Sequence, residues 1–192
     1  VAKGTIYLYV ESKEALFDLV ARYADAERPW KKLPTLPVRT PKRGATVRYV
    51  RERLAQNAAP PTLAKALAGR SATDSRGEVE AIVRELYETL ARNRCGIELI
   101  DRSARDRPDL AALWFEGARG GLIAQLAQYL EERTRRKLLR PFPDPAVTAR
   151  LLIETIVFWA VHRHWDPHPQ KVDEVVAKET VVRFIVGALA KE

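Results

Sequence analysis

Apolar residues recur at a helical spacing along almost the whole of this 192-residue chain, and no stretch shows the alternating pattern of a strand or an Asn-Gly or Asp-Gly hairpin turn. Prolines divide the pattern into segments, because proline ends or begins a helix but rarely lies inside one. Residues 29–41 hold four prolines and are expected to be an extended connector. Helices are expected over residues 4–10, 12–28, 42–59, 78–105, 108–138, 144–165 and 170–190, with a short piece at 62–69. The sequence therefore predicts an all-α protein.

The composition is that of a globular protein with an apolar core. Apolar residues make up 46% of the chain, whose length suffices for one large domain or two smaller ones. The single cysteine, Cys95, cannot form an internal disulfide, which suits a reducing cytoplasm. The longest nearly apolar run, residues 151–161, is too short to cross a bilayer and carries Glu154, which favours a buried helix. We therefore expect a cytoplasmic protein with no membrane partner.

Positive charge is concentrated in one part of the chain. The net charge is +8, and the stretch from Arg28 to Arg53 alone holds nine basic residues against one acid, Glu52. A local positive field of this kind attracts polyanions such as nucleic acid. A solvated basic surface without a partner is the alternative, and charge alone does not separate the two.

The first seventeen residues, VAKGTIYLYVESKEALF, predict a short helix followed directly by a second one. Gly4 lets the backbone at the start of the first helix approach another molecule, and the N–H groups there suit a phosphate. Lys3 and Thr5 flank this glycine and can point outward together. Ile6 and Val10, four residues apart, are expected to face inward. The buried side of the second helix is expected to consist of Leu16, Phe17, Leu19, Val20 and Tyr23.

Tyr7, Tyr9 and Lys13 indicate an anionic partner. The two tyrosines are two residues apart on a helix, so they diverge and cannot both lie in a core, whereas each hydroxyl can reach a phosphate. Lys13 follows Ser12, the expected N-cap of the second helix, so a cation lies where the helix dipole is already positive. That arrangement becomes favourable once a phosphate binds the same N–H groups. Compensation by a neighbouring glutamate is the alternative explanation.

The run from Val1 to Phe17 resembles the end of the helix-turn-helix in the tetracycline-repressor (TetR/AcrR) family of bacterial transcription regulators. The family pattern is roughly Gly-Val-Ser/Ala-Lys-Gly-Thr-Ile/Leu-Tyr-x-Tyr/His-Phe-x-Ser-Lys-Glu-x-Leu-Phe. The chain departs from it at Val10, a core position where the family usually has Phe. The resemblance covers about a tenth of the chain. By resemblance, the residues that face base edges in the major groove are Lys3, Gly4, Thr5 and Leu8, and those that hold phosphates are Tyr7, Tyr9 and Lys13.

The resemblance also implies the domain organisation. Residues 1–28 are expected to be the C-terminal part of a helix-turn-helix DNA-binding domain, whose first helix and most of whose second would precede Val1, so that this chain alone would bind DNA poorly. Residues 42–192 are expected to form an effector-binding and dimerisation domain. The implied protein is a ligand-responsive transcriptional repressor, a homodimer that binds double-stranded operator DNA until a small-molecule effector releases it.

The residues themselves support dimerisation through the last two helices. The helix expected at 144–165 is apolar nearly all round and must be covered on both sides. The helix expected at 170–190 carries a further apolar set that a monomer of this size could hardly hide. A two-fold dimer would also present two recognition helices to one DNA site.

The effector, expected to be partly apolar, could bind among aromatic and polar residues of the C-terminal helices. Aromatics at helical spacing are more often plain core, and a pocket is the alternative. Gly117, Gly120 and Gly121 lie inside an expected helix, where a close crossing, a kink beside a pocket or simple tolerance could explain them. The candidate pocket residues are Tyr87, Asn93, Glu98, Trp114, Phe115, Phe158, Trp159 and His162.

Enzyme classes find no support in the motifs. The chain has no G-x-S-x-G elbow, P-loop, dinucleotide fingerprint, HExxH or CxxC, so we expect no catalytic residue and no cofactor. HRHWDPH (162–168) holds all three histidines, but His162 and His164 diverge on a helix and Pro167 ends it before His168. Interaction with the helix C-terminal dipole is therefore favoured over a metal site. The alternatives of another class are a helical protein-interaction module without DNA binding and, more remotely, an enzyme.

Overall fold

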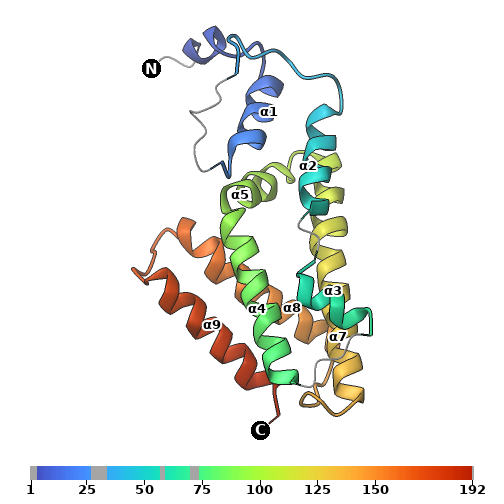
Figure 1. The fold of residues 1–192 in the computed structure, drawn as a ribbon. Coiled ribbons are helices and arrows are strands. Elements are labelled where there is room, and N and C mark those ends of the chain that lie inside the picture. The colour runs from blue at the N-terminus through green and yellow to red at the C-terminus, as the bar shows by residue number, and fades with distance from the viewer. Residues whose placement is uncertain (1–3, 27–33, 57–58, 70–73, 192) are drawn as a thin grey trace.

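The computed structural model describes residues 4–26, 34–56, 59–69 and 74–191, and every regular element within these ranges is helical (Figure 1). The helices are η1 (Thr5–Leu8), α1 (Lys13–Tyr23), α2 (Ala45–Gln56), α3 (Pro61–Leu67), α4 (Ser75–Arg92), α5 (Arg94–Ser103), α6 (Pro108–Ala111), η3 (Ala112–Arg119), α7 (Gly120–Arg135), α8 (Pro145–Ala160), η4 (His162–Trp165) and α9 (Glu174–Leu189). Of these, η1 and η4 are 3-10 helices and η3 is a π-helix. The expectation of an all-α fold is confirmed.

The larger part of the molecule, from α3 onward, packs around one apolar core (Figure 1). α4 lies against α3, α8 and α9, while α7 lies against α3 and α8. Burial of one such apolar side chain is worth about 1.5–3 kcal/mol, so these interfaces hold the body together. Almost completely buried residues from its five main helices include Leu63, Ile82, Leu130, Ile156 and Ile185.

The N-terminal elements form an extension at one end of this body (Figure 1). η1, α1 and the start of α2 lie at the end farthest from the C-terminus. A second, smaller apolar cluster of Val50, Ile100, Ala104 and Leu110 joins α2 to α5 and α6, with Phe17 of α1 packed against it. The extension is therefore attached to the body through α5 and its neighbours.

The prediction of a single helix over residues 78–105 is wrong, because the helix is interrupted at Asn93, between α4 and α5. The Asn93 side-chain amide donates to the Thr89 carbonyl (Nδ2–O 2.8 Å), which closes the C-terminus of α4. Gly96 lies in the first turn of α5, where a backbone N–H has no helical partner, and the Asp25 carboxylate accepts it. The apolar spacing continues across the break, so periodicity alone did not reveal it.

The helix expected over 108–138 runs from Pro108 to Arg135 but takes π geometry between Ala112 and Arg119. Where the π segment ends, Gly120 donates its N–H to the carbonyl of Phe115, five residues back. A Cβ at Gly120 would lie 3.0 Å from that oxygen, closer than side chains normally approach. The π geometry therefore explains sterically why position 120 is a glycine, a question that the sequence had left open.

Two residues expected to face inward are exposed instead, Ile6 at 41% and Val20 at 40%. Val10 is buried as expected, but within α1 the buried residue is Ala15, and the other apolar side chains are half-buried or exposed. The reason is that α1 packs on α2 along one side, so only one narrow stripe of the helix is covered.

The two C-terminal helices begin at aspartate N-caps. Asp144 accepts from Val147 N (2.9 Å) at the start of α8, and Asp173 accepts from Val175 N (2.8 Å) at the start of α9. Both helices are shorter than expected, because η4 replaces the last turn of the segment at 144–165 and α9 begins only at Glu174. No helix in the described part of the chain has the length and apolarity needed to span a bilayer.

Candidate nucleic-acid interface and interdomain cavity

The candidate nucleic-acid interface is the outer tip of the extension, made of η1 and the start of α1 (Figure 1). Tyr7, Leu8 and Tyr9 are exposed, Leu8 at 72%. Thr5 is half-buried, and a Cβ built on Gly4 would meet no atom within 4 Å. The helix expected over 4–10 is thus a single 3-10 turn, but it offers an open backbone and two phenols to the outside.

Ser12 is the N-cap of α1, since its Oγ accepts from Ala15 N at 3.1 Å. Lys13, at the first position of this helix, is exposed and forms no ion pair with any residue that the structure describes. Glu11 does not compensate it, because the Glu11 carboxylate accepts from Thr40 N (2.7 Å). A cation therefore lies at the positive end of a helix dipole, where an anion would be stabilised.

Residues 34–41, the described part of the connector, hold this tip in place. Val38 N donates to Tyr9 O (2.8 Å), and Glu11 N donates to Val38 O (3.0 Å), which forms a parallel bridge. The hydroxyls of Ser12 and Thr40 are 2.8 Å apart. The sequence identified this stretch as extended but not as the support of the tip, because pairing between residues almost thirty positions apart leaves no local signal.

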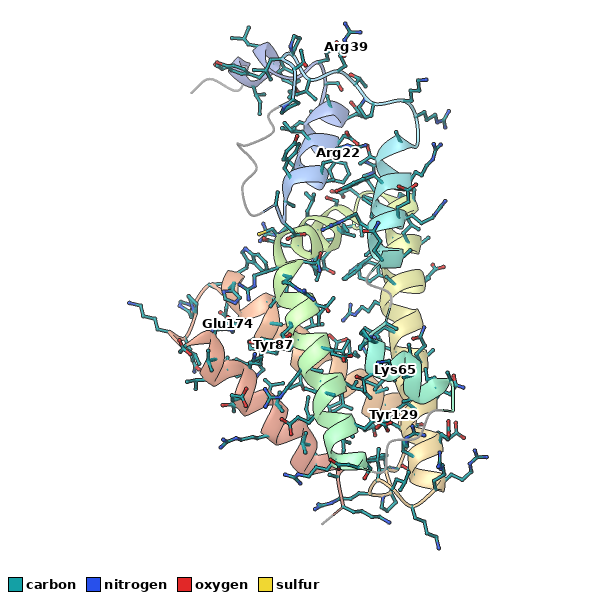
Figure 2. The ribbon with its side chains drawn as sticks, in the orientation of Figure 1. Arg22, Arg39, Lys65, Tyr87, Tyr129 and Glu174 are labelled. Carbon is teal, nitrogen blue, oxygen red and sulfur yellow. The ribbon has the colours of Figure 1, made fainter. Side chains whose placement is uncertain are left out.

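Exposed basic residues lie at the tip and follow it along the chain. Arg39 is exposed and lies at the same end of the molecule as η1 (Figure 2). Lys42, Arg43, Arg48 and Arg51 follow it on the way into α2 and along this helix, and all are exposed. Of the residues singled out from the sequence, those outside the described ranges are Lys3, Arg28, Lys31 and Lys32.

A cavity of about 130 Å³ lies where the extension meets the body. Its walls come from the end of α1, from α2, α4 and α5, from the π segment and α7, and from α8. Most of the lining is apolar, with a few polar side chains placed among it, which is the usual composition of a small-molecule site. The apolar lining includes Tyr49, Leu54, Leu90, Ile97, Trp114, Leu122, Ile153 and Val157.

Three of the eight pocket candidates line this cavity: Asn93, Trp114 and His162. Asn93 lies between α4 and α5, Trp114 in the π segment and His162 in η4. The Trp114 indole donates to Asp101 (Nε1–Oδ1 3.1 Å), and Arg53 donates to the Asn93 amide oxygen (Nη2–Oδ1 3.1 Å). The polar groups of the cavity are therefore held by contacts across its walls.

Tyr87 and Trp159, expected at a pocket, belong to the main core instead. The Tyr87 hydroxyl donates to the Trp159 carbonyl (3.3 Å) and to Glu174 (3.2 Å), and burial raises the pKa of Tyr87 to about 12 (Figure 2). The Trp159 side chain packs against this core. Neither residue lines the cavity, so their aromatic spacing reflected plain core.

Glu98, Phe115 and Phe158 also lie outside the cavity. Glu98 is half-buried and pairs with the exposed Arg102 one turn along α5 (Oε1–Nη2 2.6 Å). Phe115 is 40% exposed and Phe158 43% exposed. Each is on an element that does contribute to the cavity, but on another face, because helical rotation places neighbours about 100° apart.

The sequence did not identify six polar or glycine residues of the cavity, namely Asp25, Arg53, Thr89, Gly96, Asp101 and Arg119. Asp25 belongs to the extension and Arg53 to α2, so no pattern in the C-terminal helices could reveal them. Arg119 pairs with Glu154 (Nη2–Oε2 2.6 Å), while its Nε is buried and has no hydrogen-bond partner within the described ranges. The nearby glycines were the only hint, since they marked the π segment that carries Arg119.

In the described part of the chain, no group of three or more His, Cys, Asp and Glu side chains is arranged to hold a metal ion. His164 lies 3.5 Å from Glu174, and burial together with Arg94 and Arg163 lowers the pKa of this imidazole. The three histidines thus do not converge: His162 lines the cavity, His164 faces Glu174, and His168 is exposed.

Comparison with known proteins identifies the fold. No family model matches the chain, and no curated protein matches its sequence. The fold matches a solved structure from Mesorhizobium loti MAFF303099 described as a "putative TetR-family transcriptional regulator", with a TM-score of 0.63 over 94% of this chain and 100% of that chain. The identity is 13%, so the likeness is one of fold. The resemblance seen in the first seventeen residues is confirmed at this level: the chain has the fold of that regulator.

Proposed function

We propose that this protein is a ligand-responsive, DNA-binding transcriptional regulator of the TetR type that acts as a repressor. The observation that carries the proposal is the exposed tip, where Tyr7, Tyr9 and Lys13 stand outside the protein beside a serine-capped helix start. The shared fold supports it, because the matched regulator aligns over nearly the whole chain.

The tip would read DNA with η1 in the major groove. Lys3, Gly4, Thr5 and Leu8 would face base edges, where an open glycine backbone and an exposed leucine permit close approach. The exposed hydroxyls of Tyr7 and Tyr9 and the ammonium of Lys13 would hold phosphates on either side. The exposed arginines and lysines from Arg39 to Arg51 would add the electrostatic attraction that brings DNA to this end.

The effector would be a small, partly apolar molecule bound in the cavity between the extension and the body. A cavity of about 130 Å³ has room for a compact ligand, and its apolar walls would supply most of the binding free energy. Asn93, His162, Arg53 and Arg119 would orient it by hydrogen bonds. Because residues 1–28 and 42–192 would serve as DNA-binding and effector domains, a ligand at their junction would oppose DNA binding by one shared coupling energy.

A homodimer through α8 and α9 fits the apolar surface that these helices leave exposed. Val147, Leu151 and Phe158 recur on one side of α8, and Val176 and Phe184 on one side of α9, all of them at least 43% exposed. Unpaired apolar stripes on two adjacent helices favour a helical partner of the same kind, and a second copy provides one. The protein would then act in the cytoplasm as a binding protein rather than an enzyme.

The test of DNA binding is selection from a random duplex library with the natural full-length protein, followed by titration at several salt concentrations. Lys13→Ala should weaken binding to all sequences alike and reduce the slope of log K against log salt by about one. Lys65→Ala is the matched control, because Lys65 is an exposed helical lysine at the far end of the molecule (Figure 2). Failure to select any sequence, or a change of sequence preference in Lys13→Ala, would contradict the proposal.

The test of dimerisation is the mass in solution. Phe184→Glu combined with Leu151→Glu should convert a species of twice 21.7 kDa into one of 21.7 kDa, measured by light scattering. Ala64→Glu, at an exposed position on α3, should leave the larger mass unchanged. A wild-type mass of 21.7 kDa at micromolar concentration would rule out the dimer through these helices.

A further inference from the structure

Among the buried side-chain nitrogen and oxygen atoms of the described residues, one has no hydrogen-bond partner. It is the Nε of Arg119, the last residue of the π segment, and Arg119 lines the cavity. An N–H that is buried without an acceptor has given up its hydrogen bond to water and gained nothing in return, so such groups are rare in folded proteins. The place of this one on a cavity wall indicates that its acceptor comes from a bound molecule.

The ion pair that Arg119 makes does not satisfy this nitrogen. Nη2 of Arg119 donates to both carboxylate oxygens of Glu154, with an Nη2–Oε2 distance of 2.6 Å. The same carboxylate also accepts from Nε of Arg150, one turn earlier on α8. One negative charge therefore faces two positive charges, and a second anion beside Arg119 would be stabilised by the charge that remains.

The two carboxylates on the cavity walls already have donors. Asp101 accepts from the Trp114 indole at 3.1 Å, and Asp25 accepts from the backbone N–H of Gly96 at 3.0 Å. The unmet polar group of the cavity is thus a donor on a cation, the Nε of Arg119. A complementary ligand brings an acceptor to it, and a carboxylate is the acceptor that a guanidinium binds most strongly.

The surroundings of Arg119 determine the rest of the ligand. Ala118 and Leu122 flank it on its own helical run, and Ile153 and Val157 of α8 line the same cavity. Apolar walls around one polar group suit a molecule with an apolar body and a single acidic end. Because one water needs roughly 10–15 Å³ of such a cavity, a volume of about 130 Å³ has room for about ten non-hydrogen atoms.

We propose that the cavity binds a compact carboxylic acid with an apolar body, whose carboxylate accepts a hydrogen bond from Nε of Arg119. This inference rests on the proposed function, since it names the chemical class of the effector. The carboxylate supplies the acceptor that the buried Nε lacks and the second negative charge beside two arginines, while the body of the acid contacts the apolar walls. An amine of the same size would bring a cation to a cation and is excluded.

The experiment is titration calorimetry of the full chain at neutral pH with three acids of this size, each paired with its primary amide. The acids are benzoate, phenylacetate and 3-phenylpropionate. An amide has nearly the same shape and keeps a carbonyl acceptor but carries no charge, so the pair isolates the contribution of the carboxylate. We expect the best acid to bind about 10- to 100-fold more tightly than its own amide.

Arg119→Leu removes the donor, while Arg150 continues to pair with Glu154. The affinity of the acid should fall to that of the amide, and the affinity of the amide should stay unchanged, which completes a thermodynamic cycle. Arg119→Gln takes its place should Arg119→Leu not fold, as judged by circular dichroism. Arg150→Leu is the matched control, because it removes the other cation on the same carboxylate but does not line the cavity; the preference for the acid should change by less than about threefold.

The inference is overturned when none of the three acids binds, or when acids and amides bind the wild type equally. A preference for the acid that survives Arg119→Leu and disappears in Arg53→Leu would place the carboxylate at Arg53 and also overturn it. Its fate is separate from that of the proposed function, because the selection on duplex DNA is carried out without any acid. An acid that binds at Arg119 and leaves DNA binding unchanged would contradict the ligand response and leave this inference intact.

Discussion

The two ends of α4 are held in different ways. Near its N-terminus, Glu78 accepts from Arg133 (Nε–Oε1 2.8 Å) and from the Tyr129 hydroxyl (3.0 Å), and all three side chains are buried (Figure 2). Burial and Glu78 raise the pKa of Tyr129, so the phenol stays a donor throughout. Beyond the other end, the break at Asn93 is held by part-buried hydrogen bonds, among them that of Asp25.

This difference indicates which end of α4 is easier to displace. Breaking a buried ion pair leaves an uncompensated charge in the core, whereas a part-buried hydrogen bond is exchanged for one to water at a small cost. The end of α4 near Glu78 is therefore fixed with the core, and the end beside the cavity is held less firmly.

The largest effect is expected at the fixed end. Arg133→Leu removes the cation that pairs with the buried Glu78 and should lower the free energy of unfolding by about 3–5 kcal/mol, measured by urea denaturation. The double variant with Glu78→Leu should recover part of this loss, because no lone charge remains. A loss below about 1 kcal/mol in Arg133→Leu would mean that this end is not fixed as described.

At the end of α4 beside the cavity, Asp25→Ala should lower the free energy of unfolding much less. It removes the acceptor of Gly96 N in a part-buried place that water can reach, so we expect a loss of about 1 kcal/mol in the same denaturation experiment. The α1 amides should lose protection while those of α4 near Glu78 do not. Equal losses in the free energy of unfolding for Arg133→Leu and Asp25→Ala would show that the two ends of α4 are held equally firmly.

Cys95, between Arg94 and Gly96, provides a native probe of the contact between Asp25 and Gly96. Burial raises the pKa of its thiol, and the negative charge of Asp25 raises it further. The rate of its reaction with a disulfide reagent should therefore rise with pH around a midpoint above that of the same chain in urea. Asp25→Asn removes a negative neighbour, stabilises the thiolate and should lower that midpoint. An unchanged midpoint would place Asp25 away from the thiol in solution.

The smallest effect is expected on the outer face of α5. Glu98 pairs with Arg102, which is largely exposed, so Glu98→Gln should change the free energy of unfolding by no more than about 0.5 kcal/mol. It should also leave the binding of any cavity ligand unchanged, measured by calorimetry. If Glu98→Gln abolished ligand binding, Glu98 would instead take part in the cavity, and the two faces of α5 would not differ as described.

Local signals in the chain were reliable where an interaction lies within a few residues. The N-cap at Ser12, the extended connector and the apolar faces of α8 and α9 all follow from spacing and turn chemistry. Local signals failed to predict the structure where a residue far along the chain makes the deciding contact. The break at Asn93 is stabilised by Asp25 from another element, and five of eight pocket candidates turned to other faces because element rotation is set by packing.

By itself, the sequence determined that the chain is helical, that proline-bounded segments form its elements, and that tyrosines and a lysine beside a serine cap stay outside. These follow from short-range sterics, hydrogen bonding and hydrophobic periodicity, which each residue carries with it. Only the tertiary structure decided which faces enclose the cavity, that Asp25 of the extension and Arg53 of α2 contribute to it, and that Gly96 meets Asp25. These depend on contacts between residues far apart in the chain, and such contacts exist only once the helices have packed.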